Sequence, residues 1–394
     1  MPSFIIDKKI LQPKLGISNQ VSLRKDPIEV YTSIKVEIQA GILFLTTLNS
    51  SVFYKTSLAV KSSTTDCTLC LKTEMLAQAV DLIDGDEINL DYDEAKNTLI
   101  VKGKKVKHIL RTNSSLLSHF NEPMQNPEFR SCSFEINSSE LLKNLKGSFI
   151  AVGDPKTTYQ PEFCNVCLTA DSTNNSLIVV STDRFRIIKQ KPTITNMEFN
   201  LDNPNIKETN NFLLAPKALK FLMSAIGDSE NSTVYFEKDF AWFKFASSEM
   251  ILSYGSGTYP DYNRIIPTAF GCNFKTNPRE VLTALKQVSL TGGLDAVNKR
   301  VKLKVEPSNS IVILTAENSN GQLSESSFEI NDYEGSDEVW EQAFNSQFLS
   351  EYLTFVETDT IFWESNIAKP SILSPITKDG NIKDTELYLV SGLK

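Results

Sequence analysis

The hydrophobic and polar positions of the chain follow one pattern three times. Three segments share it: SFIIDKKILQPKL from Ser3, SFEINSSELLKNL from Ser133 and NFKTNPREVLTAL from Asn273. Each contains a phenylalanine, then Asp or Asn three residues later, then apolar residues at helical spacing. Asp and Asn are preferred helix N-caps, and apolar residues four apart share one helix face. The pattern predicts a strand that runs into a helix, once in each third of the chain.

The positions that carry the pattern can be named. They are the phenylalanines Phe4, Phe134 and Phe274, the caps Asp7, Asn137 and Asn277, and the apolar pairs Leu11 and Leu15, Leu141 and Leu145, and Val281 and Leu285.

A second helix is predicted in each third. The candidates are LKTEMLAQAVDLI from Leu71, APKALKFLMSAIG from Ala215 and NSQFLSEYLTFV from Asn345. Short stretches rich in β-branched and aromatic residues surround them, such as STVYFEKDFAWFKFAS from Ser232. The predicted fold class is therefore α+β, with three repeated domains that each pack two helices on antiparallel sheets. We place the domains at residues 1–128, 129–266 and 267–394.

The charged residues of the predicted helices suggest a basic surface. The formal net charge is −8, yet five of the six predicted helices carry Lys or Arg off their apolar stripe. The sixth, which contains SEYLTFVE, is acidic instead. For any single helix, solvated lysines on an exposed face are the simpler explanation. If the helices gather on one surface, that surface is basic and suited to contact with nucleic acid phosphates.

Composition excludes several classes of function. With 41% hydrophobic and 22% charged residues the chain resembles soluble globular proteins, and no apolar run or signal-like N-terminus is present, so we expect a cytoplasmic protein. Only two histidines occur, and we find no phosphate-binding loop. The acidic stretch DLIDGDEINLDYDE from Asp81 fails the EF-hand pattern and is better explained as a helix end that runs into a hairpin. Lys102 to Lys107 is read as a second, solvated hairpin.

The six cysteines include two CxxC pairs, Cys67 with Cys70 and Cys164 with Cys167. Zinc binding is one interpretation. Both pairs lie in segments with the pattern of strands, where residues three apart face opposite sides of a sheet and cannot readily bind one metal ion. We therefore expect reduced structural thiols.

Two motifs suggest a family. TDRFRI, from Thr182 to Ile187, and YPDYNRIIP, from Tyr259 to Pro267, together resemble the bacterial sliding clamp, the β subunit of DNA polymerase III. The resemblance extends over essentially the whole chain. It implies that three domains form a half ring, and that two chains close head to tail around double-stranded DNA as a non-catalytic processivity factor without cofactor or metal. The YPDYNRIIP segment would connect two domains.

By resemblance, part of the connector forms a wall of a pocket for short Gln/Leu/Phe peptides of the DNA polymerase III α subunit, the clamp loader and other clamp-binding proteins. The residues carried over are Phe163, Thr182, Arg184, Arg186, Ile187, Pro260, Arg264, Ile265, Asn345, Phe348, Leu389, Val390, Ser391, Gly392 and Leu393. Arg184 stands where the family often has glycine, and Ser391 and Gly392 stand where it often has methionine and proline.

Two further sets complete the expectation. The DNA-facing lining is predicted to include Arg24, Lys25, Lys72, Lys143, Lys146, Lys156, Tyr159, Lys217, Lys220, Arg279 and Lys286. In the homodimer, the strand near His108 and Leu110 is expected to meet the helix end near Leu290 of the other chain.

Two other functions remain as alternatives. One is a β-rich scaffold whose thirds arose by duplication and which forms no ring. The other is a metal-dependent hydrolase that uses the acids between Asp81 and Glu94. The threefold repeat argues against the enzyme, and the two family motifs argue against a generic scaffold.

Overall fold

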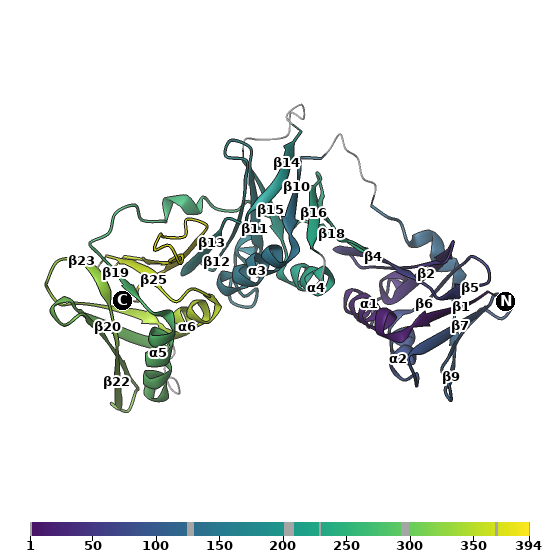
Figure 1. Cartoon of the computed structure of the whole chain (residues 1–394), viewed down its shortest axis with the longest axis horizontal. Coiled ribbons are helices and arrows are strands. Elements are labelled where there is room, and N and C mark those ends of the chain that lie inside the picture. Colours follow the sequence, from purple (N-terminus) through teal and green to yellow (C-terminus); the bar gives the residue numbers. More distant parts are fainter. Residues whose placement is uncertain are drawn as a thin grey trace. The chain divides into compact units, whose positions relative to one another are not determined.

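The computed structural model describes residues 2–123, 130–200, 209–227, 230–292, 299–366 and 369–393. The chain divides into two compact units. Unit 1 consists of Met1–Leu142 and Ile194–Gly255, and unit 2 of Lys143–Thr193 and Ser256–Lys394. Figure 1 shows the helices and strands of both. The three domain boundaries set from the sequence stay a prediction.

The repeated strand and helix are present in all three thirds. They are β1 (Ser3–Asp7) with α1 (Lys8–Val21), β10 (Cys132–Asn137) with α3 (Ser138–Ser148), and β19 (Cys272–Thr276) with α5 (Pro278–Gly292). The predicted caps act as such: Asp7 accepts from the Lys9 amide at 2.8 Å, Asn137 from Ser139 at 3.0 Å and Asn277 from Arg279 at 2.9 Å. Each cap satisfies an amide that the first helical turn leaves without a partner.

The apolar positions of the repeat form the core. Phe4, Phe134 and Phe274 are at most 1% exposed. The paired positions on the helices are as deeply buried, with Leu11 at 2% and Leu145 at 0%. Each such side chain contributes about 1.5–3 kcal/mol on burial, which explains why the pattern is retained in every third.

The second helices are also where the sequence predicts them. They are α2 (Thr73–Asp81), α4 (Pro216–Ile226) and α6 (Ser346–Phe355). The acidic stretch after Asp81 continues into the hairpin of β7 (Glu87–Asp93) and β8 (Thr98–Lys102), and Lys102 to Lys107 joins β8 to β9 (Lys107–Arg111). Both hairpin predictions are confirmed.

Unit 1 contains two antiparallel sheets. One runs in the order β5-β1-β7-β8-β9, and the other in the order β14-β10-β16-β17-β18-β4-β3-β2-β6. The other strands of these sheets are β2 (Ser33–Gln39), β3 (Ile42–Leu48), β4 (Val52–Ala59), β5 (Ser62–Ser63), β6 (Cys67–Lys72), β14 (Ile194–Phe199), β16 (Asn231–Phe236), β17 (Phe240–Lys244) and β18 (Ser248–Ser253). A further strand, β15 (Thr209–Leu214), leads into α4.

Unit 2 contains a sheet in the order β11-β12-β13-β27-β26-β25-β19-β23 and a second sheet in the order β22-β21-β20-β24. Their bounds are β11 (Val166–Asp171), β12 (Ser176–Thr182), β13 (Arg186–Gln190), β20 (Arg300–Glu306), β21 (Ile311–Glu317), β22 (Leu323–Glu329), β23 (Asn331–Gly335), β24 (Trp340–Asn345), β25 (Ile361–Ser365), β26 (Ser371–Pro375) and β27 (Glu386–Val390). Because β27 pairs with β13, the last strand of the chain lies beside the TDRFRI turn.

One local expectation needs correction. Cys164 does not lie in a strand but ends the 3-10 helix Pro161–Cys164, because Pro161 starts a turn there and β11 begins only at Val166. The connector makes a 3-10 turn at Tyr262–Arg264. All six cysteines are free thiols. Among the described helices, none has the length and apolar character required to cross a bilayer.

Candidate functional site

The turn between β12 and β13 is built by its own side chains. The Thr182 hydroxyl accepts from the Arg184 amide at 3.1 Å, and one Asp183 oxygen accepts from the amides of Phe185 and Arg186, both at 3.0 Å. Arg184 has a φ of 79°, in the left-handed region that costs little only for glycine. The expected family glycine at this position therefore has a conformational reason.

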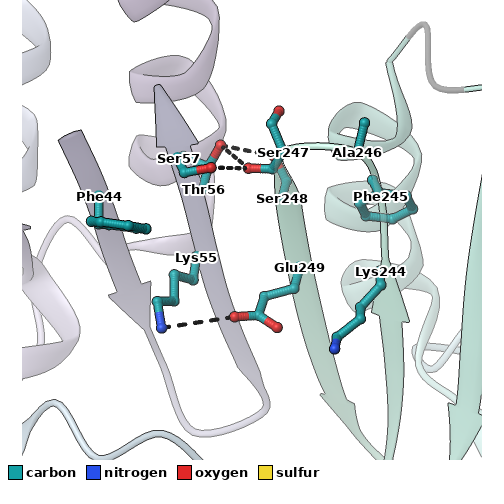
Figure 2. Close-up of a pocket in the computed structure, with 10 residues that line it drawn as sticks. All are labelled: Phe44, Lys55, Thr56, Ser57, Lys244, Phe245, Ala246, Ser247, Ser248 and Glu249. Carbon is teal, nitrogen blue, oxygen red and sulfur yellow. Dashed lines mark hydrogen bonds and ion pairs between the residues drawn. The ribbon is translucent and has the colours of Figure 1, made fainter. Parts of the chain in front are cut away.

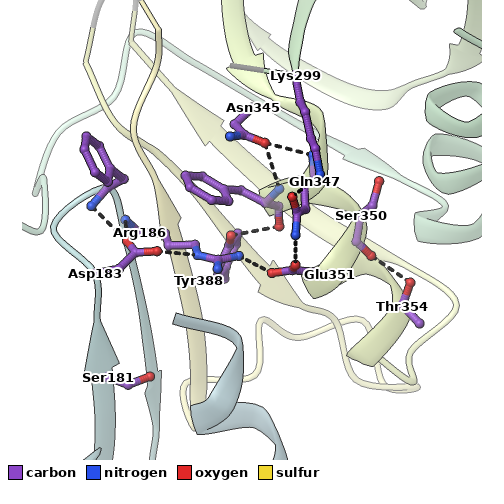
Figure 3. A network of polar contacts seen from close by, with 12 residues as sticks. Ser181, Asp183, Arg186, Lys299, Asn345, Gln347, Ser350, Glu351, Thr354 and Tyr388 are labelled. Carbon is purple, nitrogen blue, oxygen red and sulfur yellow. Dashed lines mark hydrogen bonds and ion pairs between the residues drawn. The ribbon is translucent and has the colours of Figure 1, made fainter. Parts of the chain in front are cut away.

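Arg186 is the central polar residue of the site. It is 8% exposed, and its Nε donates to Asp183 at 2.8 Å while its Nη1 donates to Glu351 of α6 at 2.5 Å. Its guanidinium lies 4.1 Å from the centre of the Phe348 ring. Figure 3 shows the guanidinium between the two carboxylates. Burial acts to lower the pKa of Arg186, but Tyr388 and the two carboxylates outweigh it and raise that pKa.

Helix α6 presents Phe348 to this turn. The Asn345 side chain caps the helix by accepting from the amides of Gln347 at 3.0 Å and Phe348 at 3.4 Å. The Tyr388 hydroxyl donates to the Phe348 carbonyl at 2.9 Å, and its ring stacks on Tyr352 at 4.4 Å. Asn345, predicted at the pocket, therefore positions the helix start with its amide oxygen.

The C-terminal tail is fixed to the same turn. Arg186 stands opposite Val390 and Ile187 opposite Leu389 in the β13–β27 pair. Beyond the strand, the Ser391 amide donates to the Phe185 carbonyl at 2.8 Å. A Cβ at position 392 would lie 2.4 Å from Nε2 of Gln342, so any side chain there would shift the end of the Gln342 side chain. A bulky residue at that position would displace Gln342.

The predicted pocket residues differ in exposure. Ile187, Leu389, Val390, Thr182 and Phe163 are at most 9% exposed and form walls and support. Pro260, Phe348, Ser391, Gly392 and Leu393 are partly exposed.

The connector supplies the most exposed members of the set. Ile265 is 53% exposed, and the side chain of Arg264 is 85% exposed beside Asp261 at 2.9 Å. Its tyrosines are instead buried: Tyr259 is 5% and Tyr262 6% exposed. Burial raises the pKa of Tyr262 to about 12, so its hydroxyl stays protonated. The connector is thus anchored by tyrosine and presents isoleucine and arginine to solvent.

Sequence reasoning missed three residues of this site. Phe185 is 54% exposed at the tip of the turn, and an aromatic between two arginines in TDRFRI was the available signal. Asp183 and Glu351 hold Arg186. For Glu351 the only signal was that SEYLTFVE is acidic where the other helices are basic.

A groove of about 550 Å³ runs from Arg186 along α6. It is lined by Lys146, Phe149, Ile150, Arg186, Gln347, Ser350, Glu351 and Thr354. The groove therefore combines hydrocarbon side chains with both charge signs.

A second hollow, of about 250 Å³, lies in unit 1 where β4 meets β18 (Figure 2). Lys55 pairs with Glu122 at 3.0 Å, Lys244 lies 3.8 Å from the Trp242 ring, and the hydroxyls of Thr56 and Ser248 bond each other at 2.8 Å. Its polar groups already have partners within the protein. We therefore assign this hollow no chemical role.

The predicted DNA-facing residues occur in both units. Arg24, Lys25 and Lys72 come together around one hollow of about 410 Å³, where the Lys72 amine donates to the Thr32 hydroxyl at 2.6 Å. Lys143 is held in an ion pair with Glu357. All of the predicted DNA-facing residues except the half-buried Lys143 are exposed: Arg24, Lys25, Lys72, Lys146, Lys156, Tyr159, Lys217, Lys220, Arg279 and Lys286.

The residues predicted for the dimer contact fall on two elements. His108 and Leu110 lie on β9, the last strand in its sheet, and Leu110 is 6% exposed. Leu290 belongs to α5, and its side chain lies outside the described residues. In the described part of the chain, no three His, Cys, Asp or Glu side chains cluster as metal ligands would.

Comparison with known proteins finds one curated relative and many solved structures of the same fold. No protein-family model matches the chain. A curated relative, the β sliding clamp of Treponema pallidum, is 22% identical over 288 residues, which is 73% of this chain and 72% of the relative.

Solved structures match the full chain. The β subunit of DNA polymerase III from Thermotoga maritima has a TM-score of 0.83 at 17% identity, with 100% of both chains covered. The Helicobacter pylori β clamp bound to a DNA ligase peptide has a TM-score of 0.83 at 18% identity and the same coverage. The griselimycin-bound sliding clamp from Pseudomonas aeruginosa has a TM-score of 0.85 at 16% identity, with 100% of this chain and 99% of that one covered. The resemblance drawn from TDRFRI and YPDYNRIIP is thus confirmed, and the chain has the fold of the bacterial DNA polymerase III β subunits, the sliding clamps.

Proposed function

We propose that this protein is a DNA sliding clamp, a non-catalytic processivity factor that encircles double-stranded DNA as a homodimer and holds the replicative polymerase on it. The assembly around Arg186 carries the proposal, because the TDRFRI turn, the start of α6 and the C-terminal tail meet there. Partly exposed Phe348 and tail residues next to a buried guanidinium form the kind of anchor that captures a short apolar peptide. The H. pylori relative, whose structure contains a DNA ligase peptide, supports this use of the fold.

Peptide capture is tested by calorimetry with a Gln-Leu-Ser-Leu-Phe peptide. We expect a Kd near micromolar for the intact chain and loss of binding when residues 391–394 are removed, since Ser391 and Leu393 bond to Phe185 and Ala343. Binding that persists without the tail would place the peptide elsewhere. No binding to the intact chain would refute the peptide site.

For the ring, we propose that β9 of one chain pairs with β22 of the other. Each strand is last in its sheet, the position at which a sheet can be extended by a strand of another chain. β9 exposes Lys107 and Arg111, and β22 exposes Glu325 and Glu329, so the edges have opposite charge. This contact would include the predicted residues His108 and Leu110, and it is consistent with a head-to-tail dimer.

The dimer is tested by sedimentation of charge-reversed variants. We expect Lys107→Glu with Arg111→Glu to yield monomers, and Glu325→Lys with Glu329→Lys to do the same. In a mixture of the two variants, both contacts of a mixed dimer pair opposite charges, one in the original order and one reversed, so heterodimers are expected. If both variants sediment as the original protein does, these edges do not form the contact.

For DNA, we propose that the basic helix residues and the hollow with Arg24, Lys25 and Lys72 contact phosphates without reading sequence. Such contacts are individually weak and depend on salt. Fluorescence anisotropy with a short duplex should show a shallower salt dependence for Arg24→Gln with Lys25→Gln. An unchanged salt slope would exclude this hollow from DNA contact.

A further inference from the structure

The two walls of the peptide site are joined by one residue outside the predicted set. Asp183 and Arg186 belong to the same turn, three residues apart, so their ion pair only shapes that turn. Glu351 is on α6, three residues after Phe348 and on the same helix face. Its bond to Arg186 is therefore the one that connects the turn to the helix.

Both oxygens of Glu351 are in use. Oε2 accepts from Arg186, and Oε1 accepts from the Gln347 side chain at 2.6 Å. Gln347 in turn accepts from the Lys299 amine. This chain of bonds, drawn in Figure 3, fixes the carboxylate from two sides, so the guanidinium is held in one orientation on the Phe348 ring.

The ion pair of Glu351 contributes little to the stability of the fold. Its side chain is 35% exposed and faces the open groove beside α6. An ion pair exposed to that extent adds little to the stability of a fold, whereas holding a guanidinium over an aromatic ring prepares a rigid surface before a partner arrives. Rigid, preformed sites bind more tightly because less side-chain entropy is lost on binding.

We propose that Glu351 is a positioning residue of the partner-binding site: it locks Arg186 onto Phe348 and so preorganises the surface that receives the apolar end of a partner peptide. This inference rests on the proposed function. It assigns to the acidic face of α6 a role in peptide affinity.

The test compares two acids near α6 by calorimetry with the Gln-Leu-Ser-Leu-Phe peptide. Glu351→Gln keeps an acceptor oxygen but weakens the bond to Arg186, and we expect it to raise Kd about tenfold. Glu357→Gln is the matched control, since Glu357 pairs with Lys143 instead, and it should bind as the original protein does. Thermal unfolding of both variants establishes that each is folded.

A double-mutant cycle with Arg186→Lys separates positioning from general damage. Lysine cannot lie flat on the ring or bind two carboxylates in a fork, so Glu351→Gln should weaken binding by less than twofold in that background. If Glu351→Gln binds as the original protein does, or if the two effects multiply in the double variant, the positioning role is refuted. If the original protein binds no peptide, the proposed function fails instead.

Discussion

Replacing Arg184 by glycine should stabilise the protein. The φ of 79° places an arginine in a left-handed conformation that costs about 1–2 kcal/mol for a residue with a Cβ. Glycine removes that cost but loses about 0.5–1 kcal/mol through its greater freedom in the unfolded chain. The expected net gain is about 1 kcal/mol, which adds roughly 0.4 M to the urea midpoint at a slope of about 2.5 kcal/mol/M.

A second variant isolates the backbone contribution. Arg184→Ala removes the exposed guanidinium, which lies 6.0 Å from the Phe185 ring, but keeps the strain. The difference in unfolding free energy between Arg184→Gly and Arg184→Ala therefore reports the relieved backbone strain minus the cost of the greater freedom of glycine in the unfolded chain. Ala40→Gly is a positive control, since Ala40 also has a left-handed φ, of 51°. If Arg184→Gly is no more stable than Arg184→Ala, the turn is not strained and the reasoning is wrong.

Three further changes test the interior of unit 2. Arg186→Ala should lower the unfolding free energy measured in urea by about 2–4 kcal/mol, because Asp183 and Glu351 lose their shared partner; a loss below 1 kcal/mol would mean that water solvates both acids. Burial raises the pKa of Glu386, so the folded protein binds this proton more tightly than the unfolded chain and loses stability as pH rises through the folded pKa. Glu386→Gln should therefore gain stability over the original protein as pH rises from 4 to 8 in thermal melts, and a pH-independent difference would contradict this. Asn345→Ala should cost about 1 kcal/mol in urea unfolding through loss of the α6 cap, similar to Asp7→Ala at α1, and no loss would show that another group caps the helix.

The repeated architecture could be predicted because its signals are local. A phenylalanine, a cap three residues on and an apolar pair four apart decide strand, helix start and buried face within a dozen residues. Backbone amides donate hydrogen bonds to the side chains of Asp7, Asn137 and Asn277, so each predicted residue caps its helix. The wrong prediction of a strand at Cys164 also has a local cause. Pro161 starts a 3-10 turn that includes Cys164, and the CxxC spacing gives no sign of it.

The partner site could be predicted only in part, since its geometry depends on residues far apart in sequence. The motif pointed to Arg186, but its partner Glu351 is 165 residues away and is reached only because α6 presents it to the turn. The left-handed φ of Arg184 was likewise hidden, because arginine gives no signal of it. The family glycine was the only hint.

The predicted basic lining also contains residues whose ion-pair partners could not be predicted from the sequence. Lys143 and Lys146 are three residues apart on α3, so the sequence gives no reason to distinguish them. In the structure Lys143 pairs with Glu357, whereas Lys146 lines the groove beside α6. An exposed ion pair is worth at most about 1 kcal/mol, so a phosphate can displace Glu357, but only after that pair is broken. If α3 contacts DNA as proposed, we therefore expect Lys143 to contribute less to phosphate binding than Lys146, although both lie on the same face of the helix.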